Sequence, residues 1–271
     1  MEFILIFVFG IIFGSFLNVV ILRIPKEQSV IFDASHCYSC SNKLKPWHNI
    51  PIFSWLFLRG KCSFCGAKIS KQYPIIEFIS GLLLVALSLK LDISVSTIFV
   101  YLSFSMLLAL SMIDFKYKMV PDSLNLLAIV FAVLGIWSIH DLVENFVNAL
   151  LIAGGFTLLR FSLSYILTSL ARIEANKTLT PWTKNYQRYP YIEAMGEGDI
   201  MVAATMGALL GVELALVAIF LSAVLTLPVM VAVHNKSPEE QRVAFVPFLA
   251  LATFIVYIYD TPIMQYIEAN Y

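Results

Sequence analysis

Long apolar segments recur along the whole of this 271-residue chain and constrain its fold more than any other feature. A helix needs about 20 residues to cross the hydrocarbon core of a bilayer, and eight segments come near that requirement. They are, approximately, Phe3–Leu22, Ile75–Leu89, Val95–Ile113, Leu124–Ile139, Phe146–Leu170, Ile200–Leu210, Leu214–His234 and Val243–Tyr259. Only 13% of the residues are charged, against about 25% in soluble domains, so most of the surface must face lipid. We therefore predict an all-α polytopic membrane protein with about eight transmembrane helices.

The sixth and seventh apolar segments can be interpreted in two ways. The sixth segment is too short to cross a membrane alone, and residues 200–234 could instead form one bent unit broken near Gly211 and Glu213. Both readings predict a helical membrane domain.

The first apolar segment has the features of a membrane anchor. Glu2 stands where a secretory signal would carry basic residues, and Arg23 and Lys26 come after the apolar run. No Ala-x-Ala cleavage motif follows it. We expect a retained helix over residues 1–23 with its N-terminus outside, across the membrane from the cytosol.

The positions of Lys and Arg predict the orientation. Of the 18 basic residues, all except Lys90 and Arg160 fall on one side of eight alternating spans. Basic residues accumulate on the cytoplasmic side of membrane proteins. The loop domain 24–73 and a second loop at about 171–197 are therefore predicted to be cytosolic, and residues 74–271 to form the main membrane domain. The second loop could be a lid or a docking strip, and its composition does not decide between them.

The first loop contains two Cys-x-x-Cys pairs, Cys37 with Cys40 and Cys62 with Cys65, separated by 21 residues. Two facing pairs can complete a tetrahedral four-thiolate site, which zinc commonly occupies. Gly66 suits a turn that needs a positive φ. We predict a small zinc-ribbon-like domain with a structural zinc ion, because four protein ligands leave no open position for catalysis.

Other uses of these cysteines are buried free thiols or a redox pair. His36 and His48 could replace a thiol as ligands, but four thiols suffice, so both are expected to be ordinary loop residues.

Two carboxylates lie where predicted spans meet the cytosolic border. Asp114 ends the third span, and Asp199 opens the sixth after Gly196-Glu197-Gly198. Ionisable residues at membrane depth are costly and commonly functional. Two such carboxylates can share one proton, so that one activates water while the other protonates the oxyanion and the leaving amine. Gly196 and Gly198 would let the backbone approach a substrate strand.

Each aspartate also has a structural reading. Asp114 could be an interfacial charge that faces water, and Asp199 could be a helix N-cap. Asp122 fits a turn or an N-cap, and Glu197 fits a solvated position.

Two further charged residues are predicted to lie inside apolar runs. Glu77 could pair with a loop arginine or bind substrate, and Arg160 should face protein, a carboxylate or a polar cavity.

Taken together, these motifs resemble the type IV prepilin peptidase family, the membrane aspartic peptidases of the Gly-x-Gly-Asp type. The resemblance follows chain order through Phe13–Val20 with Arg23–Pro25, Asn49–Pro51, Ser54–Cys62, Ile69–Ser70, Tyr73–Glu77, Asp114 with Pro121–Asp122, Glu193–Asp199, Gly207–Gly211 and Pro247–Leu249. Departures are Met201, Met119-Val120 and a longer segment before Glu193, and they leave both aspartates in place.

The resemblance implies that Asp114 and Asp199 are the catalytic pair of an enzyme of the bacterial inner membrane. Type IV prepilins and type II secretion pseudopilins would be its substrates, cut after a glycine in the leader, and the new N-terminus would be methylated. S-adenosyl-L-methionine would be the methyl donor, and the cysteine loop is associated with the methylating members.

Two other functions fit the sequence. One is a cleavage-only peptidase for other leaders, such as archaeal preflagellins, although the cysteine loop argues against it. The other is a non-catalytic membrane scaffold that binds a secretion-system component through its zinc loop. No nucleic-acid partner is expected.

Overall fold

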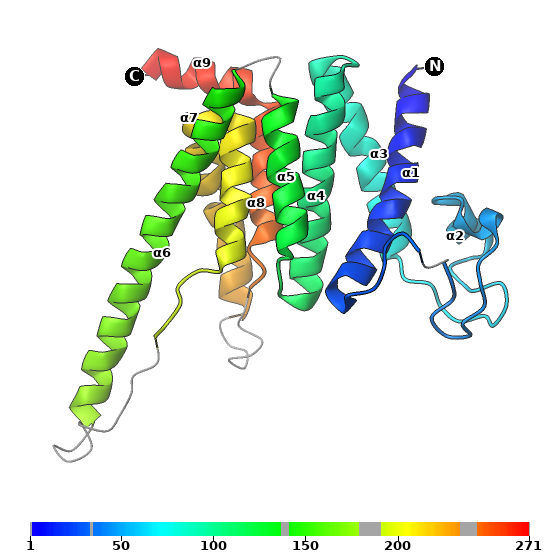
Figure 1. Cartoon of the computed structure of the whole chain (residues 1–271), viewed down its shortest axis with the longest axis horizontal. Helices are drawn as coiled ribbons and strands as arrows, with labels where there is room; N and C mark the ends of the chain where they lie inside the picture. The colour runs from blue at the N-terminus through cyan, green and yellow to red at the C-terminus, as the bar shows by residue number, and fades with distance from the viewer. Residues whose placement is uncertain (1, 33–34, 137–140, 179–190, 234–242, 271) are drawn as a thin grey trace.

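A computed structural model describes residues 2–32, 35–136, 141–178, 191–233 and 243–270 (Figure 1). Its helices are α1 (Glu2–Arg23), η1 (Ile24–Lys26), η2 (Pro46–Asn49), α2 (Phe53–Phe57), α3 (Gln72–Leu91), α4 (Val95–Tyr117), α5 (Asp122–Gly135), α6 (Leu142–Thr178), α7 (Glu197–Val233), α8 (Val246–Ile258) and α9 (Asp260–Asn270). Among the described residues, β pairing is limited to two isolated bridges in the cysteine loop. The predicted all-α polytopic fold is confirmed.

The described helices include five that are long and apolar enough to cross a bilayer, namely α1, α3, α4, α6 and α7. The bent pair α8 and α9, which meet at 77°, would make a sixth. The lower number arises because α5 has only 14 residues and because α7, which contains the predicted sixth and seventh spans, is taken as one helix although it is broken at Gly211. The predicted span ends at Ile139 and His234 lie outside the described residues.

Helix α7 is broken at Gly211, whose φ of 74° and ψ of 177° are not helical. A straight helix from Asp199 to Val233 would rise roughly 50 Å. The 13 residues from Val233 to Val246 can span at most about 45 Å, yet both Asp199 and Val246 lie beside Asp114. The chain therefore turns back within α7, as Figure 1 shows, and the non-helical residue Gly211 marks the break. The sequence reading of a unit broken near Gly211 is confirmed.

Helix α4 forms the centre of the bundle. It packs against α1, α3, α5 and α8, and Leu107, Leu110 and Ile113 are fully buried. Figure 1 shows α1, α3 and the cysteine loop on one side of α4, with α6 at the opposite side of the molecule. The central helices therefore separate one outer region, made of α1, α3 and the cysteine loop, from another that contains α6.

Helices α1 and α3 approach each other closely at two glycines of α1. A Cβ atom on Gly10 would lie 2.7 Å from the Cα of Gly81, and one on Gly14 would lie 2.7 Å from the Cα of Glu77. Small residues spaced four apart let membrane helices pack backbone to backbone. This contact fixes Glu77 against α1.

Helix α6 has 37 residues and is longer than the predicted span Phe146–Leu170. It continues to Thr178, so the loop predicted at about 171–197 begins as helix, and its part at 179–190 lies outside the described residues. The end of α6 projects beyond the bundle at the end where α7 begins (Figure 1). The start of this loop was predicted wrongly because the charged residues after Leu170 were taken to end the helix.

Helix α9, which was not predicted, lies across the other end of the bundle (Figure 1). There, Asp260 pairs with Lys90 at 2.6 Å. Lys90 is one of the two basic residues that depart from the charge asymmetry of the sequence, and this pairing neutralises it.

Candidate active site and candidate metal centre

Asp114 lies in the last turn of α4 and is only 7% exposed. Its Oδ2 accepts the backbone N–H of Val246 at 3.1 Å, and the N–H of Phe245 also donates to the carboxylate. These donors belong to the start of α8, where unpaired N–H groups favour a negative charge. The reading of Asp114 as a charge facing water is wrong, because the residue is buried against α8.

Asp199 is half-buried near the start of α7, where its carboxylate accepts the backbone N–H of Gly196. Since α7 begins at Glu197, the N-cap position belongs to Gly196, and Asp199 is the third helical residue. A carboxylate at that position that reaches back to the N-cap N–H is one half of a capping box. The reading of Asp199 as the N-cap itself is therefore wrong.

The two carboxylates lie within electrostatic range of each other. They come from helices that are 85 positions apart in the sequence. Helix packing places them together at the end of the bundle that also carries the cysteine loop (Figure 1). We name this the aspartate end.

Gly198 brings the start of α7 against the turn between α4 and α5. A Cβ atom on Gly198 would lie 2.5 Å from the Cβ of Val120, so no larger residue fits without displacement. Asn125, which is fully buried, donates from Nδ2 to the carbonyl of Gly198 at 3.4 Å. Gly198 thereby allows the start of α7 to approach the side chain of Val120. Its predicted approach to a substrate strand stays a prediction.

Sequence reasoning missed the supports of this site, namely Val120, Asn125 and the start of α8. A signal for the last existed, because Pro247 lies at the start of α8 and proline is common at the first helical positions. Asp122 is the first residue of α5, so its predicted place at a helix start is confirmed to within one position.

The four cysteines of the first loop gather in one place. Their Sγ atoms all lie within 4.8 Å of one another, and those of Cys37 and Cys65 are 3.9 Å apart. Zinc bound to four thiolates at about 2.3 Å would hold sulfur atoms about 3.8 Å apart. The cluster therefore fits a tetrahedral metal ion, and the zinc-ribbon-like loop is confirmed.

The two Cys-x-x-Cys turns have the same backbone design. In each, the first cysteine accepts a backbone hydrogen bond from the residue four positions later, Ser41 or Gly66, and both of these residues have a positive φ. The isolated bridges close the two turns at their bases. The prediction that Gly66 needs a positive φ is confirmed, and Ser41 takes the same conformation in the first turn.

Local hydrogen bonds also prepare a thiolate. The backbone N–H groups of Cys40 and Ser39 donate to Cys37 and lower the pKa of its side chain to about 6. His48 lies outside the four-thiol group, with its ring against Phe64 and its Nε2 3.3 Å from the Ser63 hydroxyl.

Comparison with known proteins identifies the family. Residues 101–231 match the model described as "Type IV leader peptidase family", and residues 8–91 match the "Bacterial Peptidase A24 N-terminal domain". A protein of Stutzerimonas stutzeri named "Prepilin leader peptidase/N-methyltransferase" is 30% identical over 94% of this chain and 90% of its own length. The chain belongs to the type IV leader peptidase family.

Proteins with the same name occur in Xanthomonas campestris pv. campestris and Bacillus subtilis. The first is 28% identical over 94% of this chain and 91% of its own. The second is 26% identical over 97% and 96%. No solved structure matches the chain. Together with the apolar helices, these bacterial relatives identify this leader peptidase as a multi-pass inner-membrane protein.

In this leader peptidase, Glu77 connects the membrane helices to the cysteine loop. Glu77 is 5% exposed, and its carboxylate accepts the N–H of Ile52 at 2.6 Å and hydrogen-bonds to Ser15 of α1. Ile52 has a φ of 61°, a conformation that a β-branched residue adopts only when its surroundings enforce it. The predicted pairing of Glu77 with a loop arginine is wrong, since the partner is a backbone amide of the loop.

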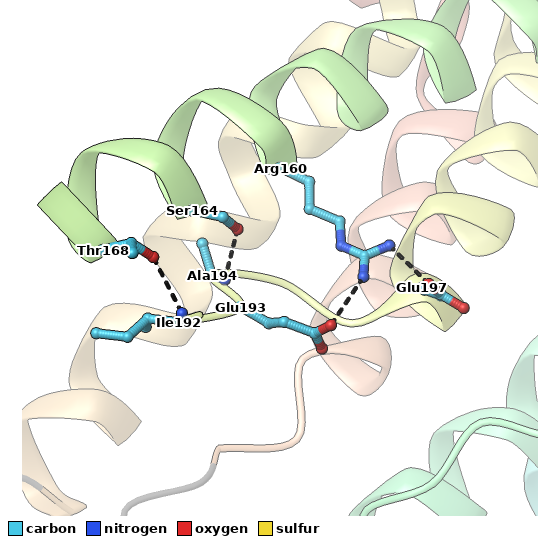
Figure 2. Close-up of polar contacts among 7 residues, drawn as sticks. All are labelled: Arg160, Ser164, Thr168, Ile192, Glu193, Ala194 and Glu197. Carbon is cyan, nitrogen blue, oxygen red and sulfur yellow. Dashed lines mark hydrogen bonds and ion pairs between the residues drawn. The ribbon is translucent and has the colours of Figure 1, made fainter. Parts of the chain in front are cut away.

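Arg160 of α6 holds the segment that leads to Asp199 (Figure 2). Its side chain is 15% exposed, and its guanidinium pairs with Glu197 at 3.1 Å and Glu193 at 3.4 Å. This confirms that Arg160 faces carboxylates. Glu197 is 83% exposed, as predicted, but it is ion-paired.

Two further hydrogen bonds join α6 to the same segment. The hydroxyl groups of Ser164 and Thr168 accept the backbone N–H groups of Ala194 and Ile192, each at 3.0 Å (Figure 2). Arg160, Ser164 and Thr168 are spaced four apart and therefore share one face of α6. We call these three residues the α6 clamp. It fixes segment 191–197 of the leader peptidase, which leads into the helix that bears Asp199 and includes its first residue, Glu197.

Proposed function

We propose that this protein cleaves the leaders of type IV prepilins and type II secretion pseudopilins and then methylates the new N-terminal amine. The observation that carries the proposal is the meeting of Asp114 and Asp199 from two separate helices at the aspartate end. The printed name of its relatives, prepilin leader peptidase/N-methyltransferase, supports both activities.

In the proposed cleavage, the two carboxylates share one proton. The ionised one removes a proton from water as the water oxygen bonds to the scissile carbonyl carbon. The protonated one donates to the carbonyl oxygen, and a proton then passes to the departing amine as the C–N bond breaks. The start of α8, the N–H of Gly196 and the α6 clamp would hold the pair in place.

We place the aspartate end on the cytosolic side of the membrane, with the N-terminus outside. Nearly all Lys and Arg residues fall on this side of the alternating spans. The two exceptions are ion-paired, Lys90 with Asp260 and Arg160 with Glu193 and Glu197. A prepilin anchored by an apolar helix with a basic leader in the cytosol would present its scissile bond at this border.

Two cofactors belong to the proposal. Cys37, Cys40, Cys62 and Cys65 would hold a structural zinc ion, which their sulfur spacing fits. S-adenosyl-L-methionine would supply an electrophilic methyl group when bound. The chain's own part in methylation would be to bind this donor near the cleaved amine.

The test replaces each aspartate by its uncharged isostere. D114N and D199N should each lower prepilin cleavage by a factor of about 100 to 10,000, the usual range for loss of general acid–base catalysis. D92N is the matched control, because Asp92 is exposed, precedes α4, and has a φ of 58° that asparagine also tolerates. Normal cleavage by a properly inserted D114N or D199N protein would favour the scaffold function instead.

A further inference from the structure

A cavity of about 530 Å³ lies between the cysteine loop and the membrane helices. Its walls come from α1, the start of α3, both Cys-x-x-Cys turns and the end of α4. Binding sites for small molecules commonly have volumes of about 300–1,000 Å³. Neither Asp114 nor Asp199 lines this cavity, so the proposed cleavage chemistry does not use it.

The cavity wall combines three kinds of side chain. Trp55 and Tyr73 offer aromatic rings, Glu77 offers a buried carboxylate, and Arg23 and Lys68 offer positive charge. A ligand that fits this wall carries a flat ring system, hydroxyl or ammonium groups, and a carboxylate. Aromatic faces also attract cations such as a sulfonium.

We infer that this cavity is the S-adenosyl-L-methionine site of the protein, an inference that rests on the proposed function. The rings of Trp55 and Tyr73 would face the adenine or the sulfonium. Glu77 would accept from the ammonium or ribose hydroxyls, and Arg23 would face the carboxylate. Glu77 would thereby serve two purposes, since it also holds the cysteine loop over the cavity through Ile52.

The end of α4 connects this cavity to the aspartates. Lys116 lines the cavity, whereas Asp114, two residues earlier, is buried against the start of α8. Residues two apart on a helix point in nearly opposite directions. The new N-terminus would therefore pass from one side of the end of α4 to the other between cleavage and methylation.

Methyl transfer from the donor to the amine needs no oxidant, reductant or further co-reactant. The N-terminal amine forms a bond to the methyl carbon as the carbon–sulfur bond breaks, and the bonding electron pair stays on sulfur. The amine loses one proton to water, and S-adenosylhomocysteine leaves.

The decisive experiment fills the cavity from α1. Val19 lines it, and V19F would place a phenyl ring inside, whereas V8F makes the same change on the exposed, lipid-facing part of α1. Tritium-labelled S-adenosyl-L-methionine is titrated against the purified full-length, zinc-loaded protein in detergent. We expect wild type and V8F to bind alike and V19F to bind about ten-fold more weakly or worse, which is a loss of about 1.4 kcal/mol.

E77Q is a second test variant, which removes a charge from the cavity wall and does not fill the cavity. Glutamine still offers an oxygen to the N–H of Ile52 but lacks the negative charge, so the loop should stay docked while donor binding weakens. Zinc content and elution as a single species show that each variant is folded. Binding by V19F and E77Q that equals the wild type would overturn the assignment.

The basic wall residues suggest one competing occupant, an anionic phospholipid headgroup. Phosphatidylglycerol nanodiscs that displace the labelled donor competitively, with no effect of V19F on methylation of prepilin, would overturn the inference in favour of lipid. Wild type that neither cleaves nor methylates prepilin would reject the proposed function itself. Wild type that does both, with a V19F protein that binds the donor normally, would reject only this cavity.

Discussion

The aspartate pair and the cysteine cluster lie at the same end of the molecule but are built in different ways. Asp114, Asp199 and the start of α8 are distant in sequence and meet because apolar helices pack together. The four cysteines lie within 29 residues, and short backbone turns bring them together. One site thus depends on the membrane bundle and the other on local turns and a metal ion. The two activities should therefore be separable by substitution.

The largest expected effect lies in the bundle. If the aspartates act as a unit, the double variant D114N/D199N should cleave prepilin no more slowly than the slower single variant. When two residues act as one catalytic unit, removing either one costs nearly as much rate as removing both. Initial rates of leader release by the three variants and the wild type measure this.

Losses that multiply in the double variant would mean that the two carboxylates contribute independently. That result would break the account of a shared proton. D92N, at an exposed site, is combined with each single variant as a control. These double variants show how the rate losses of two unrelated substitutions combine.

The next effect separates the two regions. Replacing Cys37 and Cys62 by serine removes one thiol from each turn, so the proposed zinc site should be lost and the loop should unfold. We expect methylation to fall by at least about ten-fold, as when support for a metal site is lost. Cleavage should fall much less, because the aspartates are held by helix packing. Zinc content by mass spectrometry and both activities on one prepilin check this.

Equal losses of cleavage and methylation in this variant would show that the loop supports the bundle as well. Cleavage and methylation would then not depend on separate regions of the protein.

A smaller effect is expected at the contact between the regions. E77A removes the acceptor for the N–H of Ile52 and leaves that half-buried group unpaired, at a cost of up to about 1–3 kcal/mol. The loop should detach more often, and trypsin should cut the lysine-rich segment 24–71 faster. E77Q should restore protection, because its amide oxygen can accept the same hydrogen bond. Unchanged proteolysis of E77A would mean that other contacts dock the loop.

The smallest effect concerns the α6 clamp. R160K keeps the charge but loses the fork that reaches both Glu193 and Glu197, so segment 191–197 should loosen. We expect hydrogen exchange to rise at Ile192 and Ala194 and cleavage to fall by a few-fold, since partly exposed ion pairs contribute up to about 1 kcal/mol. R59K, at an exposed position of the cysteine loop, is a matched control. Unchanged hydrogen exchange in R160K would mean that Arg160 does not hold segment 191–197 in place.

The sequence predicted those features that arise from local patterns. Apolar length gave the membrane class, the paired cysteines gave the thiol cluster, and Gly211 gave the break in α7. Each of these follows from residues that are near one another in the chain.

The features that the sequence did not predict depend on packing between distant segments. The partners of Glu77 and Asp114 are backbone N–H groups of Ile52 and Val246, and a backbone amide has no residue-type signature. Arg160 was expected to face a carboxylate, but the register of segment 191–197 along α6 decides which one. Helix α9 was missed because it is too polar to resemble a span.

The most direct measurement is mass spectrometry of the mature pilin N-terminus made with wild type, D114N and the Cys37/Cys62 double-serine variant. We expect a cleaved and methylated N-terminus with wild type and an uncleaved leader with D114N. We expect cleaved but largely unmethylated pilin with the cysteine variant. A cleaved pilin in the D114N sample, or uncleaved prepilin with the cysteine variant, would contradict the proposed roles of the aspartates and the cysteine loop.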